Sequence, residues 1–334
     1  MNNCSVGITG IGSFVPEKIV TNDDLAKLVD TSNEWILERT GIRERRIAER
    51  DISTSDLSTK AALKALQDAN LKSEEIDLII VATTTPDYMF PATACIVQNN
   101  IGAVNAAAFD MSVGCSGFIY ALATGAGFIN SRLYKRVLVI GSETLSKIVD
   151  WEDRNTCVLF GDGAGACILE PCEKNYGILS YDLGSNGEKG DVLILPAGGS
   201  REPASIESVK ARRHYVNMDG REVFKFAVRI MEKSSLTALK KANMDIGDLD
   251  FLVPHQANIR IIDSARKKLN LSEDKICVNL DKYGNMSSAS IPIALDEAIK
   301  DNRIKRGDSV LLVAFGAGLT WGAALMRWNR REES

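Results

Sequence analysis

The feature that most constrains the fold of this chain is an internal repeat at an offset of 173 residues. The segment ALQDANLKSEEIDLIIV (65–81) resembles ALKKANMDIGDLDFLVP (238–254): each reads as a helix end, a short linker and an apolar strand. At the same offset, VLVIG from Val137 aligns with VLLVA from Val310. Both matches place a strand-like run at the same point of each copy.

A third segment has the same spacing, because Leu122 of GCSGFIYAL aligns with Leu295 of NMSSASIPIAL. Three matches in one register indicate a duplicated chain rather than chance similarity. We therefore divide the sequence into two related halves, 1–172 and 173–334.

Each half alternates strand-like and helix-like segments, which predicts an α/β fold with two pseudo-symmetric halves. The runs LIIVATTT, RVLVIG, FLVPH and SVLLVAFG are short, apolar and rich in β-branched residues, as expected for strands buried on both faces. Residues 57–70 and 222–242 have helical spacing. A helix that starts near Cys115 carries small residues four apart, so we expect it to be buried between the two sheets.

Composition narrows the function classes. With 45% hydrophobic and 25% charged residues among 334, the chain is expected to be a soluble globular protein. We find no leader-like N-terminus and no run of about 18 apolar residues, so we expect no membrane insertion and a cytoplasmic location. A net charge of −4 argues against a general nucleic-acid binder. The basic runs RTGIRERRIAER, KARRH and IRIIDSARKKL suit phosphates or an acidic partner, or are solvated faces.

Metal and disulfide sites are not expected either. The seven cysteines form no C-x-x-C pair, and only two histidines, His214 and His255, are present. Neither a structural zinc site nor a disulfide framework fits this pattern.

Cys115 is the candidate nucleophile. It stands in DMSVGCSGFIYAL, where a strand-like run gives way to a helix-like one, and Gly114 and Gly117 allow close approach of the backbone. At a helix start the unsatisfied N–H groups and the helix dipole favour a thiolate, so we expect a pKa below that of a free thiol. The alternative is an inert buried cysteine.

The duplication predicts which residues accompany Cys115. At the offset of 173 Cys115 corresponds to Ser288, so the two helix starts are expected to lie together around a pseudo-twofold axis. His255 follows the strand 249–254 at its carboxyl end, where open α/β sheets place ligands. Asn285 lies in the turn DKYGNMSS just before the second helix. We therefore expect Cys115, His255 and Asn285 to meet in one cleft.

With these residues in place, the sequence resembles the thiolase-fold condensing enzymes, and most closely the β-ketoacyl-acyl-carrier-protein synthase III family. The likeness rests on an ordered set of motifs over almost the whole chain: GITGIGSFVPEKIVTND, EWILERTGIRERRIA, GCSGFIYAL, FGDGAGACIL, PAGGSREPAS, PHQANIRII, YGNMSSASIPIAL and FGAGLTWGAALMRW. The resemblance implies a thiolase-like fold with layers α-β-α-β-α. It also implies the initiating condensation of bacterial type II fatty-acid synthesis, with acetyl-CoA or another short acyl-CoA as starter and malonyl-acyl-carrier protein as extender.

The resemblance also assigns residues to each role in the site. The catalytic triad is Cys115, His255 and Asn285. The contacts to coenzyme A fall on Trp35, Arg39, Arg154 and Asn258. The surface for acyl carrier protein falls on Gln256, Ala257, Asn258, Ile259 and Arg260, with Lys225, Lys267 and Lys268. No cofactor is implied, since both thioesters are substrates.

The chemistry agrees with this assignment. A cysteine can accept an acyl group from a thioester, and the tetrahedral intermediate needs N–H donors, which we expect from Cys115 and from the loop Gly316, Ala317 and Gly318. Loss of CO₂ from a malonyl thioester leaves an enolate oxygen that neutral His255 and Asn285 can stabilise. Thiolases proper use a second cysteine in the C-terminal glycine loop, and AFGAGLTWG has none. The resemblance gives the family three glycines in this loop, and Ala317 replaces the middle one in this chain. Which N–H of the loop completes the oxyanion hole is therefore left open.

Three other functions are compatible with parts of the sequence. A thiol protease would use the same triad types, but would not require duplicated halves or basic clusters. A catalytically silent scaffold of this fold would bind an acyl carrier without reacting. A related synthase would use a different starter for a specialised metabolite.

The resemblance finally implies a homodimer. It places Phe90 of DYMFPATA at the contact between subunits, where the ring reaches across to close the acyl pocket of the partner. A bulky ring shortens that pocket, so a short starter such as acetyl-CoA is expected.

Overall fold

The computed structural model describes residues 5–330, so Cys4, one of the seven cysteines, lies outside the described residues. The first of its two large sheets contains β1 (Ser5–Phe14), β4 (Leu78–Ala82), β5 (Ala107–Met111), β6 (Val137–Thr144) and β7 (Asp162–Cys172). The strand order is β1-β7-β6-β4-β5. β4 runs parallel to β5 and β6, and β7 runs antiparallel to β6 and β1.

The second sheet has the same arrangement. It contains β8 (Gly177–Ser185), β11 (Phe251–Pro254), β12 (Ser309–Gly316) and β13 (Thr320–Arg327), in the order β11-β12-β13-β8. β11 runs parallel to β12, and β13 runs antiparallel to β12 and β8. A parallel bridge joins Leu252 of β11 to Ile276, in the position that β5 holds in the first sheet. The two sheets therefore share one topology.

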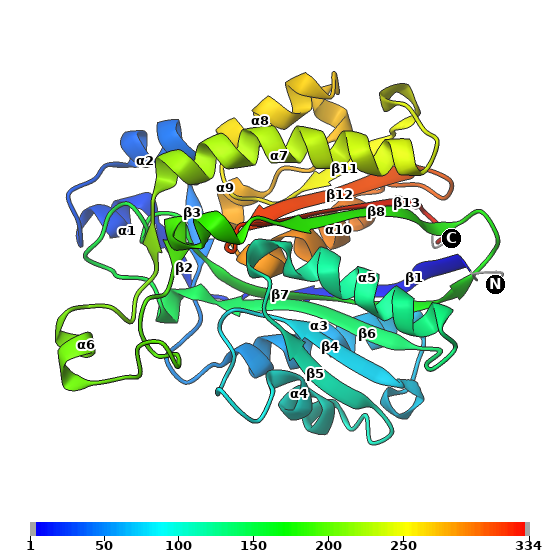
Figure 1. The fold of residues 1–334 in the computed structure, drawn as a ribbon, viewed down its shortest axis with the longest axis horizontal. Helices are drawn as coiled ribbons and strands as arrows, with labels where there is room; N and C mark the ends of the chain where they lie inside the picture. Colours follow the sequence, from blue (N-terminus) through cyan, green and yellow to red (C-terminus); the bar gives the residue numbers. More distant parts are fainter. Residues whose placement is uncertain (1–4, 331–334) are drawn as a thin grey trace.

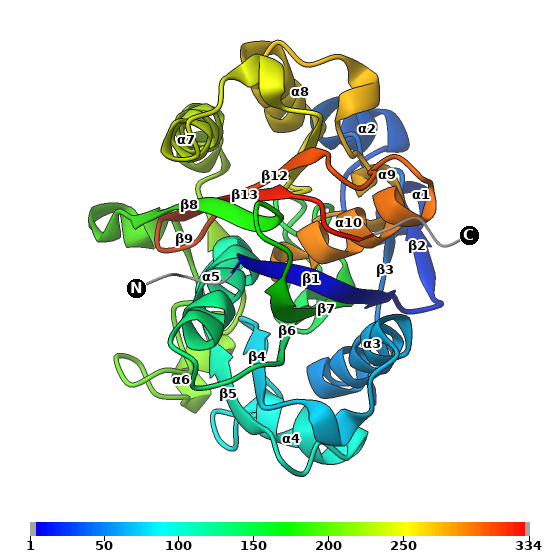
Figure 2. The same cartoon turned by 90° about the vertical axis from the view of Figure 1, so that its right-hand side faces the viewer.

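Helices form three layers around these sheets (Figures 1 and 2). α3 (Thr54–Ala69) and α4 (Thr93–Ile101) cover the outer face of the first sheet, and α7 (Gly220–Lys241) and α8 (Ile259–Lys268) cover that of the second. α5 (Gly117–Asn130) and α10 (Ser290–Lys300) lie between the sheets. The layered α-β-α-β-α fold predicted from the sequence is confirmed, as is the buried helix that follows Cys115.

The offset of 173 residues appears again in the boundaries of the elements. β4 starts at Leu78 and β11 at Phe251, while α5 starts at Gly117 and α10 at Ser290. Two 3₁₀ turns also correspond residue by residue, η2 (Gly114–Ser116) and η7 (Ser287–Ala289). The pseudo-symmetry of the two halves is thus confirmed at the residues that form the start of each central helix.

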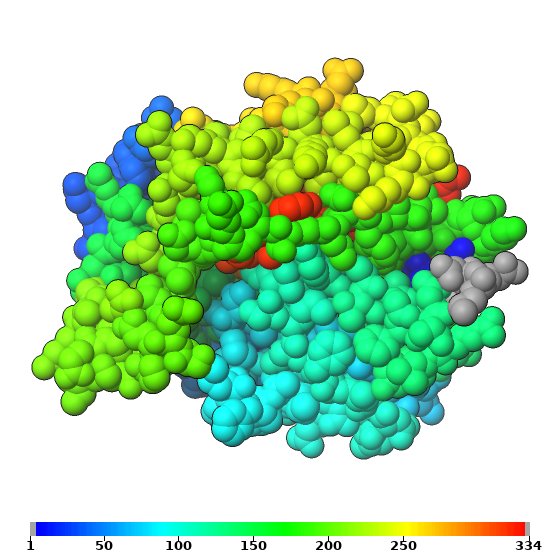
Figure 3. Space-filling model, viewed as in Figure 1, coloured from blue at the N-terminus to red at the C-terminus, as the bar shows by residue number. Residues whose placement is uncertain are grey.

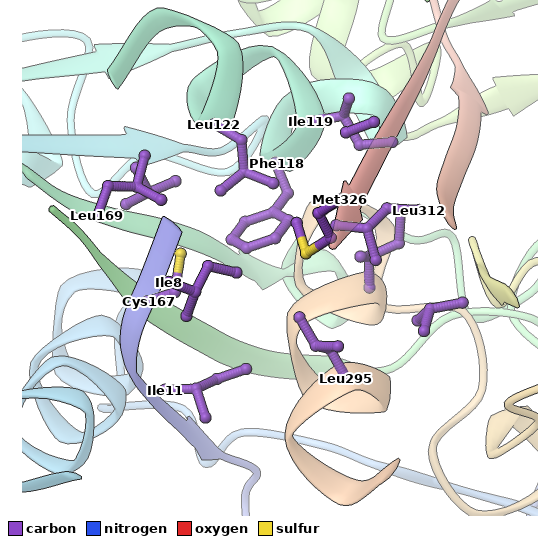
Figure 4. Packing of buried hydrophobic residues seen from close by; sticks show 14 of the residues in the cluster. Ile8, Ile11, Phe118, Ile119, Leu122, Cys167, Leu169, Leu295, Leu312 and Met326 are labelled. Carbon is purple, nitrogen blue, oxygen red and sulfur yellow. The ribbon is translucent and has the colours of Figure 1, made fainter. Parts of the chain in front are cut away.

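The main core lies between the sheets, around the two central helices (Figure 4). Phe118 and Leu122 of α5 point toward Leu169 of β7, and Leu295 comes from α10. All four side chains are fully buried. Burial of one such side chain stabilises the fold by about 1.5–3 kcal/mol, so this cluster fixes the ends of both helices at the centre of the molecule.

Several shorter elements lie outside the five layers. Residues 186–219 form an arm that projects from the body and carries α6 (Figures 1 and 3). The remaining elements are α1 (Asn22–Ala26), α2 (Asn33–Thr40), α6 (Ile206–Lys210), α9 (Leu280–Tyr283), β2 (Ile19–Thr21), β3 (Glu44–Arg46), β9 (Leu193–Ile194) and β10 (Asn217–Met218).

Candidate active site

Cys115 lies in η2, directly before α5, and the glycine loop of the second half packs against it. Gly114 has a φ of +55°, and a Cβ on it would lie 2.8 Å from the backbone nitrogen of Ala317. A Cβ on Gly316 would lie 2.4 Å from the backbone nitrogen of Cys115. Only glycine allows this approach. The structure therefore brings the predicted nucleophile and the predicted oxyanion loop together.

Ser287 connects Cys115 with the other two predicted catalytic residues, and sequence reasoning did not single it out. Its φ is +45°, in the left-handed region that glycine favours, at the position equivalent to Gly114. Its N–H donates to Oδ1 of Asn285 (2.9 Å), and its side chain lies beside the thiol of Cys115 and lowers the pKa of that thiol. Its carbonyl oxygen accepts from the backbone N–H of Ser290 and also lies 2.9 Å from Oγ of Ser290. The offset of 173 from Gly114 was the signal that could have identified it.

Asn285 is held by its backbone and oriented by its side chain. Its N–H donates to the carbonyl of Leu159 (2.8 Å), and its carbonyl accepts from the N–H of Gly161 (3.0 Å), so both bonds come from the first half. The N–H of Ser287 can only donate, which assigns its partner on the amide as the oxygen. The Nδ2 group of Asn285 is therefore the part of the amide available as a donor.

His255 directly follows β11, at the carboxyl end of the strand, as predicted. The side chain is fully buried, and its Nδ1 lies 2.7 Å from Oγ of Ser290. The ring of Phe315 meets the imidazole edge-on, with centroids 5.4 Å apart. Burial lowers the pKa of His255 to about 3, so the imidazole is neutral at physiological pH.

The structure does not support the expected thiolate at Cys115, whose side chain is half-buried. Burial raises the pKa of the Cys115 thiol to about 12, above its ordinary value near 9. Desolvation has the largest effect on this pKa; the side chain of Ser287 lowers the pKa, and the nearby Glu143 raises it further. Helix polarity alone does not overcome the loss of water around the sulfur.

Glu143 is a buried carboxyl group beside the site that sequence reasoning also missed. It is fully buried, and burial raises its pKa above the ordinary value. The N–H of Thr84 (3.0 Å) and the hydroxyl of Thr85 (2.8 Å) donate to its Oε2, and the hydroxyl of Ser288 donates to its Oε1 (3.0 Å). The bond from Ser288 joins η7 of the second half to β6 of the first, whereas the two threonine bonds lie within the first half.

The four residues predicted to contact coenzyme A are also brought together. The guanidinium carbon of Arg39 lies 4.7 Å from the ring centroid of Trp35, and that of Arg154 lies 5.2 Å from it. Asn258 caps α8 and donates from Nδ2 to the carbonyl of Arg39 (2.8 Å). Their contacts to a substrate stay a prediction.

The predicted carrier-protein surface is only partly available. Gln256 is fully buried, with Nε2 donating to the carbonyls of Pro254 and Cys277 and Oε1 accepting from the N–H of Asn279. A side chain committed to internal bonds cannot meet a docking protein, so the prediction for Gln256 is wrong in this conformation. The resemblance assigned the whole run from Gln256 to Arg260 to this surface, and a family motif does not show which of its side chains point inward.

The other residues of this surface lie on or beside α7 and α8. Ala257 and Ile259 are half-buried, whereas the basic side chains are exposed. Arg260 packs over the ring of Phe224 (5.4 Å), next to Lys225. Lys268 is paired with Glu232 (2.6 Å). We name the exposed group formed by Lys225, Arg260, Lys267 and Lys268 the basic surface.

Phe90 lies on the loop that joins β4 to α4. Its exposed fraction is 85%, and the neighbouring Tyr88 and Met89 are 62% and 80% exposed. Three consecutive exposed apolar residues form an apolar patch at the surface of the single chain.

Metal-binding clusters and membrane spans are both absent from the described residues. Within residues 5–330, no cluster of three or more His, Cys, Asp or Glu side chains is placed to hold a metal ion. No helix in the described part of the chain has the length and apolar character needed to cross a bilayer.

Comparison with known families and sequences agrees with this geometry. Residues 109–187 match the family model described as 3-oxoacyl-[acyl-carrier-protein (ACP)] synthase III, and residues 239–328 match its C-terminal companion. A β-ketoacyl-[acyl-carrier-protein] synthase III from Caldanaerobacter subterraneus subsp. tengcongensis is 59% identical over 326 residues, covering 98% of both chains. One from Desulfitobacterium hafniense is 57% identical, covering 98% of this chain and 99% of the relative.

A solved structure has the same fold. The 3-oxoacyl-[acyl-carrier-protein] synthase III of Aquifex aeolicus superposes with a TM-score of 0.90 at 49% sequence identity. The match covers 97% of this chain and all of that one.

Proposed function

Because this chain belongs to the β-ketoacyl-[acyl-carrier-protein] synthase III family, we propose that Cys115, His255 and Asn285 carry out the two half-reactions of its condensation. The enzyme is an acyltransferase that initiates fatty-acid synthesis. Relatives that are 50–59% identical to it, such as those of Caldanaerobacter subterraneus and Fusobacterium nucleatum, are named as the same synthase, so a specialised-metabolite enzyme is not favoured. A protease is likewise not supported.

The first half-reaction transfers an acyl group from acyl-CoA to the sulfur of Cys115. The sulfur forms a thioester bond as the bond between the acyl carbon and the CoA sulfur breaks, and the thiol proton leaves with CoA. Since the pKa of Cys115 is raised, the free enzyme holds a thiol, and the proton must be removed during attack. The close approach of Gly316 to the Cys115 amide supports an oxyanion hole built by both halves.

The second half-reaction uses the two residues of the second half. A malonyl thioester bound to acyl carrier protein loses CO₂, and the electron pair moves onto the thioester oxygen as an enolate. A neutral imidazole and an amide N–H can donate to that oxygen without protonating it. The enolate carbon then attacks the acyl-cysteine, and the released thiolate takes up a proton. One well-placed oxyanion donor lowers the barrier by about 3–4 kcal/mol.

The observation that carries this proposal is the hydrogen-bonded connection through Ser287. Ser287 donates to the amide oxygen of Asn285, and its carbonyl accepts from the N–H of Ser290, whose hydroxyl lies 2.7 Å from the imidazole of His255. The side chain of Ser287 lies beside the thiol of Cys115. Such a network holds three functional groups from distant parts of the chain in a fixed relation.

Substrate entry is proposed from the surface around α2 and α8. The planar group of Trp35, with Arg39 and Arg154 near its ring, suits an aromatic base and its phosphates. Asn258 links this region to α8 and is proposed to contact the pantetheine arm. The basic surface is proposed to bind acyl carrier protein, which is acidic in this pathway.

We further propose that the enzyme is a cytoplasmic homodimer that prefers acetyl-CoA. The exposed patch of Tyr88, Met89 and Phe90 supports a subunit contact, and Phe90 would close the acyl pocket of the partner. Each extra methylene in such a pocket changes the discrimination by about 1–3 kcal/mol, so the preference is graded rather than absolute.

The proposal is tested by acylation. Incubation with acetyl-CoA, followed by digestion and mass spectrometry, is expected to show an acetyl group on the peptide that contains Cys115. The fully buried Cys167 serves as an internal control within the same digest. An acetyl group found only on another cysteine, or on none, would contradict the assignment.

A further inference from the structure

The hydroxyl of Ser290 faces two groups that compete for its single hydrogen. Ser290 is fully buried at the start of α10, with Oγ 2.7 Å from Nδ1 of His255 and 2.9 Å from the carbonyl oxygen of Ser287. A carbonyl can only accept, whereas a neutral imidazole nitrogen either donates or accepts. The direction of this hydroxyl therefore decides which nitrogen of His255 carries the proton.

Two states are possible. If the hydroxyl donates to Ser287, Nδ1 of His255 must carry the proton and donate to Ser290, which leaves Nε2 as a bare acceptor. If the hydroxyl donates to Nδ1, the proton of the neutral ring is on Nε2. Only the second state offers an N–H to an enolate oxygen.

The carbonyl of Ser287 does not depend on this hydroxyl. The backbone N–H of Ser290 donates to the same oxygen, as the last bond of η7. When the hydroxyl turns to His255, the carbonyl is still hydrogen-bonded, so the second state leaves no buried carbonyl without a donor.

We propose that Ser290 is a positioning residue that holds His255 in the tautomer with the proton on Nε2, as the decarboxylation requires. This inference rests on the proposed role of His255 as a donor to the enolate. Within residues 5–330, Ser290 makes the side-chain hydrogen bond of this imidazole, and the aromatic ring of Phe315 packs against the imidazole as an apolar wall. A ring nitrogen fixed by its partner is the usual way in which a protein selects a histidine tautomer.

The other half of the molecule shows that the fold itself does not require this hydroxyl. The residue equivalent to Ser290 is Gly117, which has no side chain and packs against Ala82 and Ser288. The start of a central helix thus forms with or without a hydroxyl, and the hydroxyl is present only where it meets a histidine.

The test combines a spectroscopic and a kinetic readout. The chain has two histidines, so ¹⁵N labelling of histidine gives two imidazoles, and a His255→Ala spectrum assigns them. We expect the wild-type His255 to carry its proton on Nε2. In Ser290→Ala the bare Nδ1 loses its donor in a buried site, which disfavours that tautomer, and a fraction with the proton on Nδ1 is expected.

The same variants are compared in the two half-reactions. Ser290→Ala is expected to slow decarboxylation about ten- to a hundredfold, the range typical of lost orienting partners, with acetyl transfer to Cys115 within about threefold of wild type. Ser290→Thr keeps a hydroxyl and should recover most of the rate. Ser235→Ala is the matched control, because it removes a fully buried hydroxyl on α7 that donates to the carbonyl of Met231 and does not meet His255.

Several results would overturn the inference. A wild-type spectrum with the proton on Nδ1 would do so without any variant, and so would a Ser290→Ala spectrum identical to wild type. An equal loss of acetyl transfer and decarboxylation in Ser290→Ala would indicate a merely structural role. If His255→Ala decarboxylates at the wild-type rate, the proposed function itself fails. If His255→Ala is slow while Ser290→Ala is fast, only the inference about Ser290 fails.

Discussion

The two halves of this molecule have the same helix start and use it differently. In the first half the turn reads Gly114, Cys115, Ser116, Gly117, and in the second it reads Ser287, Ser288, Ala289, Ser290. The first residue of each turn has a positive φ, +55° and +45°. The first turn carries the thiol of Cys115 between two glycines, which have no side chains. The second turn carries hydroxyl groups that bond to neighbouring residues. The same backbone thus carries the proposed acyl acceptor in one copy and the residues that contact His255 and Asn285 in the other.

The strands that pack against these two turns also differ, because one contributes a long side chain and the other contributes none. Glu143 on β6 and Gly316 on β12 are equivalent positions, and each meets the helix start of the other half. Glu143 binds the hydroxyl of Ser288, whereas Gly316 leaves room for the backbone of Cys115. The buried side chain of Glu143 therefore holds η7 in place by a hydrogen bond. The missing side chain of Gly316 allows the backbone of Cys115 in η2 to approach closely.

The most direct way to remove the difference between the two turns is to replace Cys115 by the residue at the equivalent position of the second half. Cys115→Ser places at 115 the residue that stands at 288. Because a hydroxyl is a much poorer nucleophile than a thiol at neutral pH, we expect condensation to fall by at least about a thousandfold. The rate of condensation of acetyl-CoA with malonyl-acyl-carrier protein measures this, and a variant that keeps a tenth of the activity would contradict the role of Cys115.

A methyl group at Gly316 should be the next largest perturbation. Its Cβ would lie 2.4 Å from the nitrogen of Cys115, so the backbone of one of them must move. A displacement of about 1 Å at a reacting group costs on the order of a hundredfold in rate, and we expect that loss for Gly316→Ala in acetyl transfer. Gly247→Ala is the matched control, because a Cβ there has nothing within 4 Å. Equal activity in the two variants would show that the close contact has no role.

The buried imidazole makes the second half sensitive to acid. The pKa of His255 is about 3 in the folded chain against an ordinary value of 6.5, so the unfolded chain binds more protons between these values. The free energy of unfolding should therefore fall as pH decreases below about 6.5, by up to about 1.4 kcal/mol per pH unit from this group.

Denaturant unfolding between pH 6 and pH 4 measures the effect of His255. His255→Ala should have a shallower slope of unfolding free energy against pH than the wild type, because the other titrating groups are shared. Parallel slopes would indicate that the imidazole becomes protonated without cost in the folded state.

The basic surface should give the smallest effect, and one confined to the second half-reaction. Replacing exposed Arg260 and Lys267 by glutamate should raise KM for malonyl-acyl-carrier protein about tenfold at low salt, since charge complementarity mainly steers association. Acetyl transfer from acetyl-CoA should stay unchanged. The control replaces exposed Lys135 and Lys240 by glutamate: it makes the same charge change outside the basic surface, with Lys240 about 22 Å along α7 from Lys225. If KM rises by the same factor in this control, the effect depends on the total charge of the protein and not on the basic surface.

Much of the fold could be predicted because it depends on features that repeat along the chain. Apolar runs, helical spacing and one offset were enough to identify the buried strands, the outer helices 57–70 and 222–242 and the central helix after Cys115. The projecting arm 186–219 has no counterpart in the repeat, and its short strands and helix carry no strong period. Sequence periodicity therefore predicted the layers and not the arm.

The site could be predicted where a residue stands at the end of an element. Cys115, His255 and Asn285 each follow from such a position, and the network through Ser287 places them together. The pKa of Cys115 and the burial of Gln256 could not be predicted, because both depend on which atoms exclude water. Ser290 escaped notice because its function comes from a histidine 35 residues away in the sequence.

The central claim is that the first half accepts the acyl group and the second half decarboxylates the extender. The most direct test measures single-turnover acetyl transfer to Cys115 and CO₂ release from malonyl-acyl-carrier protein separately, in His255→Ala and Asn285→Ala. We expect CO₂ release to fall about a hundredfold or more in each variant, while acetyl transfer stays within about threefold of wild type. Retention of CO₂ release in both variants, or an equal loss of both half-reactions, would contradict this division of labour.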